Sequence, residues 1–138
     1  MENKIFNNNL FQKVKDLKLS IGEYALFGSA PLGIRGLRNC RDIDIIVTES
    51  LWRECCKEKN WEMKKMPHGS EYLWSGEIEI WKDWYPGKWD MQKLIDEAEI
   101  IDGLPFVKLE YVIETKKRSG RDKDLEDIEM IKNFLRNE

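Results

Sequence analysis

The sequence predicts an α+β fold: one domain with a mixed β-sheet and helices packed mainly on one face. Short apolar runs typical of strands gather in the first half of the chain, and segments with helical spacing come before, between and after them. No repeat or Pro/Gly-rich linker divides the 138 residues, a length suited to one core. One domain spanning residues 1–138 is therefore expected, with an α/β sandwich as the alternative architecture.

The first half of the chain predicts two helices and two strands. A helix should follow Asn8 and Asn9, because Leu10, Val14 and Leu17 recur at helical spacing before Gly22. The run YALFGSA predicts a strand that ends in a Gly-Ser turn. A second strand is expected over residues 42–48, and a helix over about residues 50–59.

The second half predicts a hairpin and then mostly helices. SEYLWSGEIEIW contains two strand-like runs around Ser75-Gly76, a connection suited to a two-residue turn. The remaining expected elements are a helix over residues 90–98, a short strand at 100–101, and helices over about 107–118 and 122–135, separated by Gly120.

Two aspartates in the second strand are the main candidates for chemistry. Asp is depleted from strands, yet DIDII places Asp42 and Asp44 two residues apart, so both carboxylates leave the same face. Ile43 and Ile45 then point into the core. Two adjacent negative charges indicate a cation, and Mg²⁺ or Mn²⁺ with substrate phosphates fits carboxylate ligands.

Two further features complete the candidate site. Gly28-Ser29 ends the first strand, where glycine allows close backbone approach and a hydroxyl near amides can hold phosphate oxygens. A third carboxylate is expected from EIEIW, as a metal ligand or as a general base. We favour Glu79, which isoleucines flank on both sides, and keep Glu77 as the alternative.

Gly28-Ser29, twelve intervening residues and then Asp42-Ile43-Asp44-Ile45 resemble the signature of the DNA polymerase beta-like nucleotidyltransferase superfamily. The tail LPFVKLEYVIETKKRSGRDKDLEDIEMI is similar to the small bacterial branch, which includes antibiotic nucleotidyltransferases and abortive-infection toxins. The resemblance implies a minimal nucleotidyltransferase fold and transfer of a nucleoside monophosphate from a nucleoside triphosphate to a hydroxyl acceptor. It leaves the acceptor open: a small molecule, an RNA end or a protein side chain.

Residues of the tail also receive roles from this resemblance. Lys116 shares a helical stripe with Leu109, Val112 and Ile113, and a lysine on an inward stripe usually has an anionic partner. The resemblance implies that Lys116 reaches phosphate, that Arg121, Lys123 and Asp124 brace the last helix against the site, and that Arg121 touches the nucleotide. A surface charge cluster that includes Asp127 is the alternative for these residues.

The tryptophans and the resemblance both bear on assembly. The resemblance implies that a member of this size lacks a separate acceptor-binding domain, so a second subunit is expected to supply that wall. Trp74, Trp81, Trp84 and Trp89 lie close together in the sequence around Tyr85. Stacking on a base or an aromatic acceptor is one interpretation, and packing in the core or in a homodimer interface is the other. His68 is expected in a loop.

Composition limits the class of protein. The net charge of −3 excludes a global basic field for coating nucleic acid, and three cysteines form neither a disulfide framework nor a CxxC site. With no signal peptide or membrane-length apolar run, we expect a cytoplasmic protein. The alternative function is a low-turnover nucleotide-binding or interaction module, such as one half of a toxin-antitoxin pair.

Overall fold

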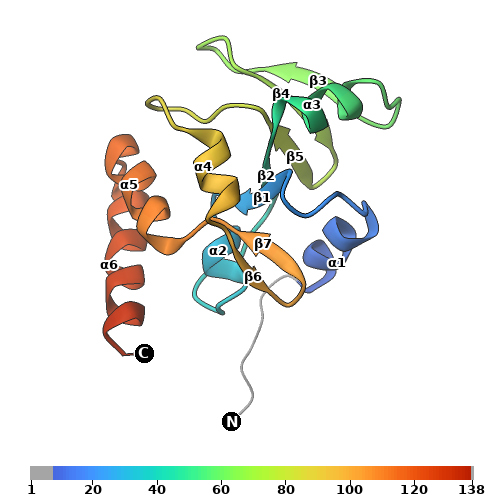
Figure 1. Cartoon of the computed structure of the whole chain (residues 1–138). Coiled ribbons are helices and arrows are strands. Elements are labelled where there is room, and N and C mark those ends of the chain that lie inside the picture. The colour runs from blue at the N-terminus through green and yellow to red at the C-terminus, as the bar shows by residue number, and fades with distance from the viewer. Residues whose placement is uncertain (1–7, 138) are drawn as a thin grey trace.

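The computed structural model describes residues 8–137 and contains one seven-stranded mixed sheet with helices around it (Figure 1). The strand order is β3-β4-β5-β2-β1-β7-β6. The strands are β1 Tyr24–Phe27, β2 Ile43–Val47, β3 Glu62–Lys65, β4 Glu71–Ser75, β5 Ile78–Trp81, β6 Glu99–Ile101 and β7 Leu104–Phe106. The predicted α+β fold with a mixed sheet is confirmed. The expectation that the chain carries no signal peptide falls partly on residues 1–7, which lie outside the described range.

Six helices belong to the described part of the chain: α1 Asn8–Asp16, α2 Ala30–Gly33, α3 Glu49–Cys56, α4 Met91–Asp96, α5 Leu109–Ser119 and α6 Asp122–Arg136. Local sequence accounts for several helix ends. The Thr48 hydroxyl accepts from the Leu51 amide at the start of α3, and Asp90 caps α4 in the same way. Gly120, with a φ of 65°, ends α5 in the left-handed conformation.

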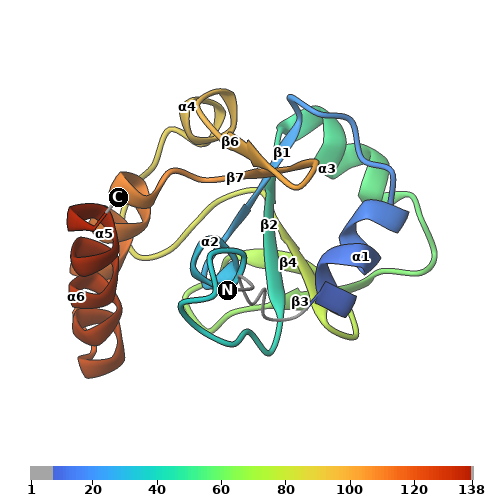
Figure 2. The ribbon, with the colours of Figure 1, turned by 90° about the horizontal axis from the view of Figure 1, so that it is seen from below.

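The helices divide between the two faces of the sheet more evenly than the sequence suggested. α1 and α3 pack on one face, and α4, α5 and α6 lie on the other (Figure 2). The reason is that β1 is apolar on both sides: Tyr24 and Leu26 enter the first core cluster, and Ala25 and Phe27 enter the second. Both faces at the centre of the sheet therefore need cover.

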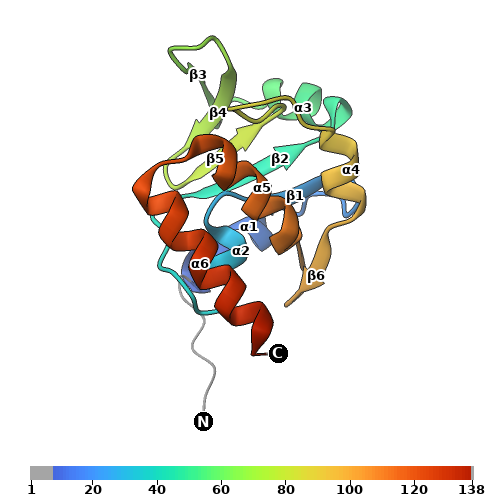
Figure 3. The same cartoon turned by 90° about the vertical axis from the view of Figure 1, so that its left-hand side faces the viewer.

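The pairing of β1, β2 and β5 at the centre of the sheet determines where Glu77 and Glu79 lie. β2 is antiparallel to β1 and parallel to β5, so these three strands lie side by side. The β4–β5 connection consists of Gly76 and Glu77, one residue later than predicted, because Ser75 still pairs with Ile78. This register places Glu77 in the turn and Glu79 in the strand. The α5–α6 pair stands in front of these strands in Figure 3.

Candidate active site

Asp44 and Glu79 face the same side of the sheet on neighbouring strands. β2 and β5 are parallel, and the register pairs Asp44 with Glu79 directly. The flanking isoleucines, Ile43 and Ile45, point into the core on the opposite face, as the alternation predicted. Glu77 instead lies in the exposed turn, where it accepts a hydrogen bond from Lys13. The geometry thus favours Glu79 over Glu77 as the carboxylate beside Asp44.

The Asp44 carboxylate sits in an unfavourable environment for a negative charge. Burial raises the pKa of Asp44 well above its ordinary value, and the charge of Glu79 raises it further. A hydrogen bond from the Trp81 indole nitrogen to Asp44 Oδ1, 3.1 Å long, partly opposes this effect on the pKa. Much of the charge is therefore uncompensated by protein groups, which suits a cation.

The turn after β1 lies against this carboxylate. Gly28 has a φ of +60°, and a Cβ atom at this position would come within 2.3 Å of Asp44 Oδ2. Glycine is needed here both for the backbone angle and for the space. Ser29 follows as the N-cap of α2, but its side chain makes no capping hydrogen bond, so the helix does not use its hydroxyl.

Asp42 is less enclosed than Asp44. It precedes β2, is exposed, and is the weakest of the named influences on the pKa of Asp44. Within residues 8–137, no group of three or more His, Cys, Asp or Glu side chains is arranged to hold a metal ion. The carboxylates that the structure pairs directly are Asp44 and Glu79, whereas Asp42 lies exposed just before β2.

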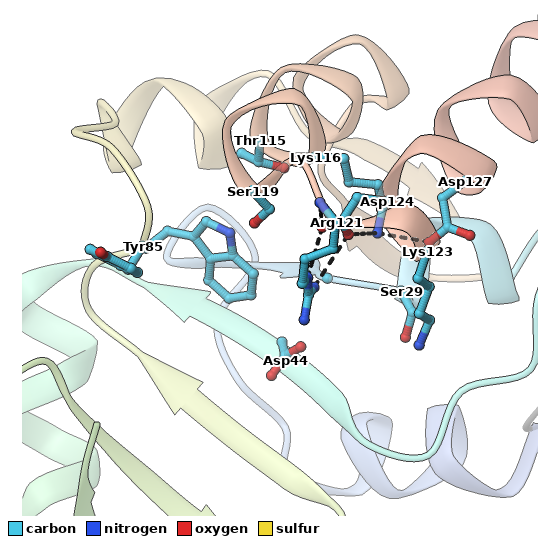
Figure 4. Close-up of a pocket in the computed structure, with 12 residues that line it drawn as sticks. Ser29, Asp44, Tyr85, Thr115, Lys116, Ser119, Arg121, Lys123, Asp124 and Asp127 are labelled. Atoms are coloured by element: carbon cyan, nitrogen blue, oxygen red, sulfur yellow. Dashed lines mark hydrogen bonds and ion pairs between the residues drawn. The ribbon is translucent and has the colours of Figure 1, made fainter. Parts of the chain in front are cut away.

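A polar cleft of about 230 Å³ extends from Asp44 to the C-terminal helices (Figure 4). Gly28, Ser29 and Asp44 line the side formed by the sheet. Trp84 and Tyr85 line one end. The facing wall comes from α5 and α6 and consists of Thr115, Lys116, Ser119, Arg121, Lys123, Asp124 and Asp127. The cleft therefore joins residues that the sequence predicted for the site but that lie nearly 100 positions apart.

Lys116 has the anionic partner that its helical stripe predicted, but that partner is protein. Its ammonium lies 2.9 Å from Asp127 Oδ2 and 3.7 Å from Asp124 Oδ1, and both aspartates are almost fully buried. Arg38, in the loop before β2, binds Asp127 from the other side at 2.6 Å. Lys116 thus lines the cleft while it holds α5 against α6 and, through Asp127, against this loop.

Arg121 is bound to Asp124 and also remains open to the cleft. Its Nε donates to Asp124 Oδ2 at 2.8 Å, while its side chain is mostly exposed. Burial alone would raise the pKa of Asp124, but the hydrogen bond and charge of Arg121, together with Lys116, lower it below its ordinary value. The contact of Arg121 with Asp124 lies within the first turn of α6, and the predicted bracing of the helix against the site stays a prediction. Lys123 lines the same cleft one helical position before Asp124.

A second pocket adjoins the first at Asp44. It has a volume of about 550 Å³ and is lined by Asp44, Met66, Pro67, His68, Glu79, Trp81, Trp84 and Tyr85. Of the aromatic cluster in the sequence, Trp81, Trp84 and Tyr85 belong to this pocket. Trp89 instead donates its indole N–H to the carbonyl of Pro86, and Trp74 lies under the Lys64 ammonium.

Sequence reasoning missed Arg38, Thr115, Ser119 and the role of His68. Arg38 carries no local signal, because its partner Asp127 is 89 residues away. His68 was expected in a loop, and it does lie in the β3–β4 turn. Its ring, however, stacks on Tyr85 with centroids 3.8 Å apart. This contact depends on two loops meeting in space.

Comparisons with protein-family models, curated proteins and solved structures found no match. Among the described residues, no helix is both long and apolar enough to cross a membrane.

Proposed function

We propose that this chain is a metal-dependent nucleotidyltransferase of the DNA polymerase beta-like superfamily, acting in the cytoplasm. The observation that supports the proposal most is the pairing of Asp44 with Glu79: Asp44 lines the cleft together with the Gly28-Ser29 turn, Arg121 and Lys123, and Glu79 lies beside it in the adjoining pocket. A carboxylate pair next to the Gly28-Ser29 turn, with Arg121 and Lys123 across the cleft, suits a metal-bound triphosphate, while Asp124 and Asp127 on the same wall are paired within the protein.

The residues fit a divalent magnesium or manganese ion. Mg²⁺ needs only one or two protein carboxylates, because waters and substrate phosphates complete its coordination. Asp44 and Glu79 supply the enclosed pair and Asp42 a more exposed ligand. Bound metal would supply charge neutralisation for the transferred phosphoryl group and the departing pyrophosphate. The raised pKa of Asp44 agrees with this assignment, since a nearby cation would restore the ionised carboxylate.

The remaining residues hold the nucleotide and move the proton. The Gly28-Ser29 turn and the Ser29 hydroxyl would contact triphosphate oxygens, with Arg121 and Lys123 opposite. The acceptor oxygen forms a bond to the α-phosphorus, the bond from that phosphorus to the β-bridging oxygen breaks, and pyrophosphate leaves. Glu79 would take the acceptor's hydroxyl proton. Lys116 acts mainly by fixing α6 over the cleft and adds positive charge to its wall.

The test compares two glutamates of the same hairpin. Glu79→Gln should lower transfer of label from nucleoside triphosphates by about 100-fold or more, whereas Glu77→Gln should leave it nearly unchanged. Candidate acceptors are RNA, proteins of a cell extract and small hydroxylated molecules. Calorimetry with magnesium and α,β-methylene-ATP should show at least about tenfold weaker binding for Asp44→Asn. Equal affinity in wild type and Asp44→Asn would remove the proposal.

Binding without transfer to any acceptor would favour the low-turnover module instead. We also propose a homodimer, in which a second subunit contributes to the wall around the acceptor. Light scattering at high protein concentration would show a monomer if this is wrong.

A further inference from the structure

The second pocket, which we call the aromatic pocket, is bounded by Met66, His68, Trp81, Trp84 and Tyr85. Its walls come from the β3–β4 turn, from β5 and from the loop after β5. The ring of His68 stacks face to face on that of Tyr85 with an interplanar angle of 18°, so an aromatic pair joins two separate loops at this wall. Such a wall is suited to a planar ring.

The lining also indicates what charge the occupant has. Among the described residues that line the aromatic pocket, none is lysine or arginine, and the ionisable side chains are the carboxylates of Asp44 and Glu79, the imidazole of His68 and the phenol of Tyr85. In the proposed function the metal at Asp44 and Glu79 is taken up by the triphosphate, so a phosphate or carboxylate in this pocket would find no lysine or arginine to pair with. An anionic occupant, including the phosphodiester chain of RNA, is therefore disfavoured.

Its position relative to the cleft indicates which reactant it takes. Asp44, Trp84 and Tyr85 line both cavities, whereas the cations Lys116, Arg121 and Lys123 line only the cleft. With the triphosphate beside those cations, pyrophosphate leaves toward α5 and α6. In-line displacement requires the attacking oxygen on the other side of the α-phosphorus, where Glu79 and the aromatic pocket lie.

We propose that the aromatic pocket binds the acceptor, and that the acceptor is a small uncharged molecule in which a flat aromatic ring system carries a hydroxyl group. Its volume of about 550 Å³ is in the range of small-molecule sites. The ring lies against the aromatic walls, and the hydroxyl points to Glu79. This inference rests on the proposed function, because it places the nucleotide in the cleft.

The experiment uses 2-naphthalenemethanol as a neutral probe and 2-naphthalenesulfonate as its anionic counterpart. Saturation-transfer NMR should detect the neutral probe on the full-length protein and little or none of the sulfonate. The neutral probe should still bind when magnesium and α,β-methylene-ATP saturate the protein. Displacement of the probe by the nucleotide would show that the pocket holds the nucleobase and would overturn the proposal. Competition by a short RNA, or equal binding of the sulfonate, would also overturn it.

Variants locate the probe. Met66→Trp fills the aromatic pocket and Tyr85→Ala removes half of its stacked wall, so each should weaken probe binding by about tenfold or more. Met63→Trp is the matched control, since Met63 lies on the neighbouring β3, is 46% exposed and does not line the pocket. Probe binding that is equal in Met66→Trp, Tyr85→Ala and Met63→Trp would contradict the proposal. Failure of nucleotide binding alone would count against the proposed function, because probe binding is measured separately.

Discussion

Gly28 and Gly76 both have a left-handed backbone but differ in the space around them. Their φ angles are +60° and +64°, yet a Cβ at Gly28 would strike Asp44 Oδ2, and a Cβ at Gly76 would meet nothing within 4 Å. Gly76→Ala should cost about 1 kcal/mol of unfolding free energy from the backbone angle alone. Gly28→Ala should cost about 1–3 kcal/mol more, because Asp44 must move.

Urea denaturation measures the two costs, and metal-nucleotide affinity gives an independent readout. Gly28→Ala should weaken that affinity, while Gly76→Ala should preserve it. Equal stability of the two variants would mean that the turn after β1 can shift away from Asp44 without cost.

The charge of Asp44 predicts a conflict between stability and function. Because the pKa of Asp44 is raised in the folded protein, folding favours the protonated carboxyl. Without metal, stability contributed by this group is present below its ordinary pKa of 3.8 and is lost as pH rises toward the raised value. Asp44→Asn removes that loss, so at pH 7 it should be more stable than wild type by about 1 kcal/mol.

Calorimetric unfolding of metal-free protein checks this prediction. The difference should shrink as pH falls below the ordinary pKa of 3.8, where the wild-type carboxyl becomes protonated in both states. Added magnesium with nucleotide should reverse the order of stability at pH 7, because only the wild type can bind it well. A less stable Asp44→Asn protein at pH 7 without metal would contradict this account.

At the scale of elements, α6 is held over the cleft by the buried carboxylate of Asp127. It is paired with Arg38 at 2.6 Å and with Lys116 at 2.9 Å, and is almost fully buried. Asp127→Asn removes the nearest carboxylate of both cations and leaves the longer contacts of Lys116 with Asp124 and of Arg38 with Glu126, so we expect a loss of about 3–5 kcal/mol in unfolding free energy.

The neighbouring Glu126 provides the control for that experiment. It lies 4.0 Å from Arg38 and is 74% exposed, so Glu126→Gln should cost less than about 1 kcal/mol. Urea denaturation of both variants, followed by tryptophan fluorescence, makes the comparison. Similar small losses for both would mean that α6 does not depend on this ion network.

Elements with a strong local pattern were predictable from the sequence. β2 and α6 each lie within one residue of the range expected, because alternation and helical spacing are properties of the segment itself. β3 and β7 were not predicted. β3 consists of Glu62–Lys65, mostly exposed polar residues that become a strand by pairing with β4, and β7 contains a proline and only three residues.

The residues of the candidate site were likewise predictable only where the signal in the sequence is local. Asp44, Glu79 and Gly28 followed from strand alternation and from the turn after β1, which are local features. The pairing of Lys116 with Asp127, and of Arg38 with the same carboxylate, depends on how α6 packs against the sheet. No spacing in the sequence encodes that packing, so the phosphate role expected of Lys116 became mainly a structural one in our proposal.

At the scale of the whole molecule, a polar cleft and an aromatic pocket adjoin each other at Asp44. The cleft is polar and carries cations, the second pocket is aromatic, and Asp44 lines both. In a chain with a net charge of −3, the cations Lys116, Arg121 and Lys123 gather where α5 ends and α6 begins, beside Asp124 and Asp127. If the aromatic pocket binds the acceptor as we propose, this chain supplies part of the wall that we expected from a second subunit.

The division of the cleft between the sheet and α5–α6 predicts how ligand binding changes motion. Nucleotide with magnesium would contact Asp44 on β2 and Arg121 at the start of α6. It would thus tie the α5–α6 pair to the sheet; the two are otherwise connected by the chain after β7 and by the apolar core between them. Openings that separate α6 from the sheet must release the ligand. At a ligand concentration 100 times the dissociation constant, such openings become harder by about 2.7 kcal/mol.

Hydrogen exchange with mass detection tests this with magnesium and α,β-methylene-ATP. Amides of α5 and the first turns of α6 should exchange about 100-fold more slowly when the ligand is bound. Those of α1, which packs on the opposite face of the sheet, should change far less. Slower exchange of equal size in α1 would indicate that the molecule opens only as a whole. Unchanged exchange in α6, at a concentration where calorimetry shows saturation, would mean that the nucleotide binds to the sheet without reaching Arg121, and that the cations of the cleft serve only to hold the two helices together.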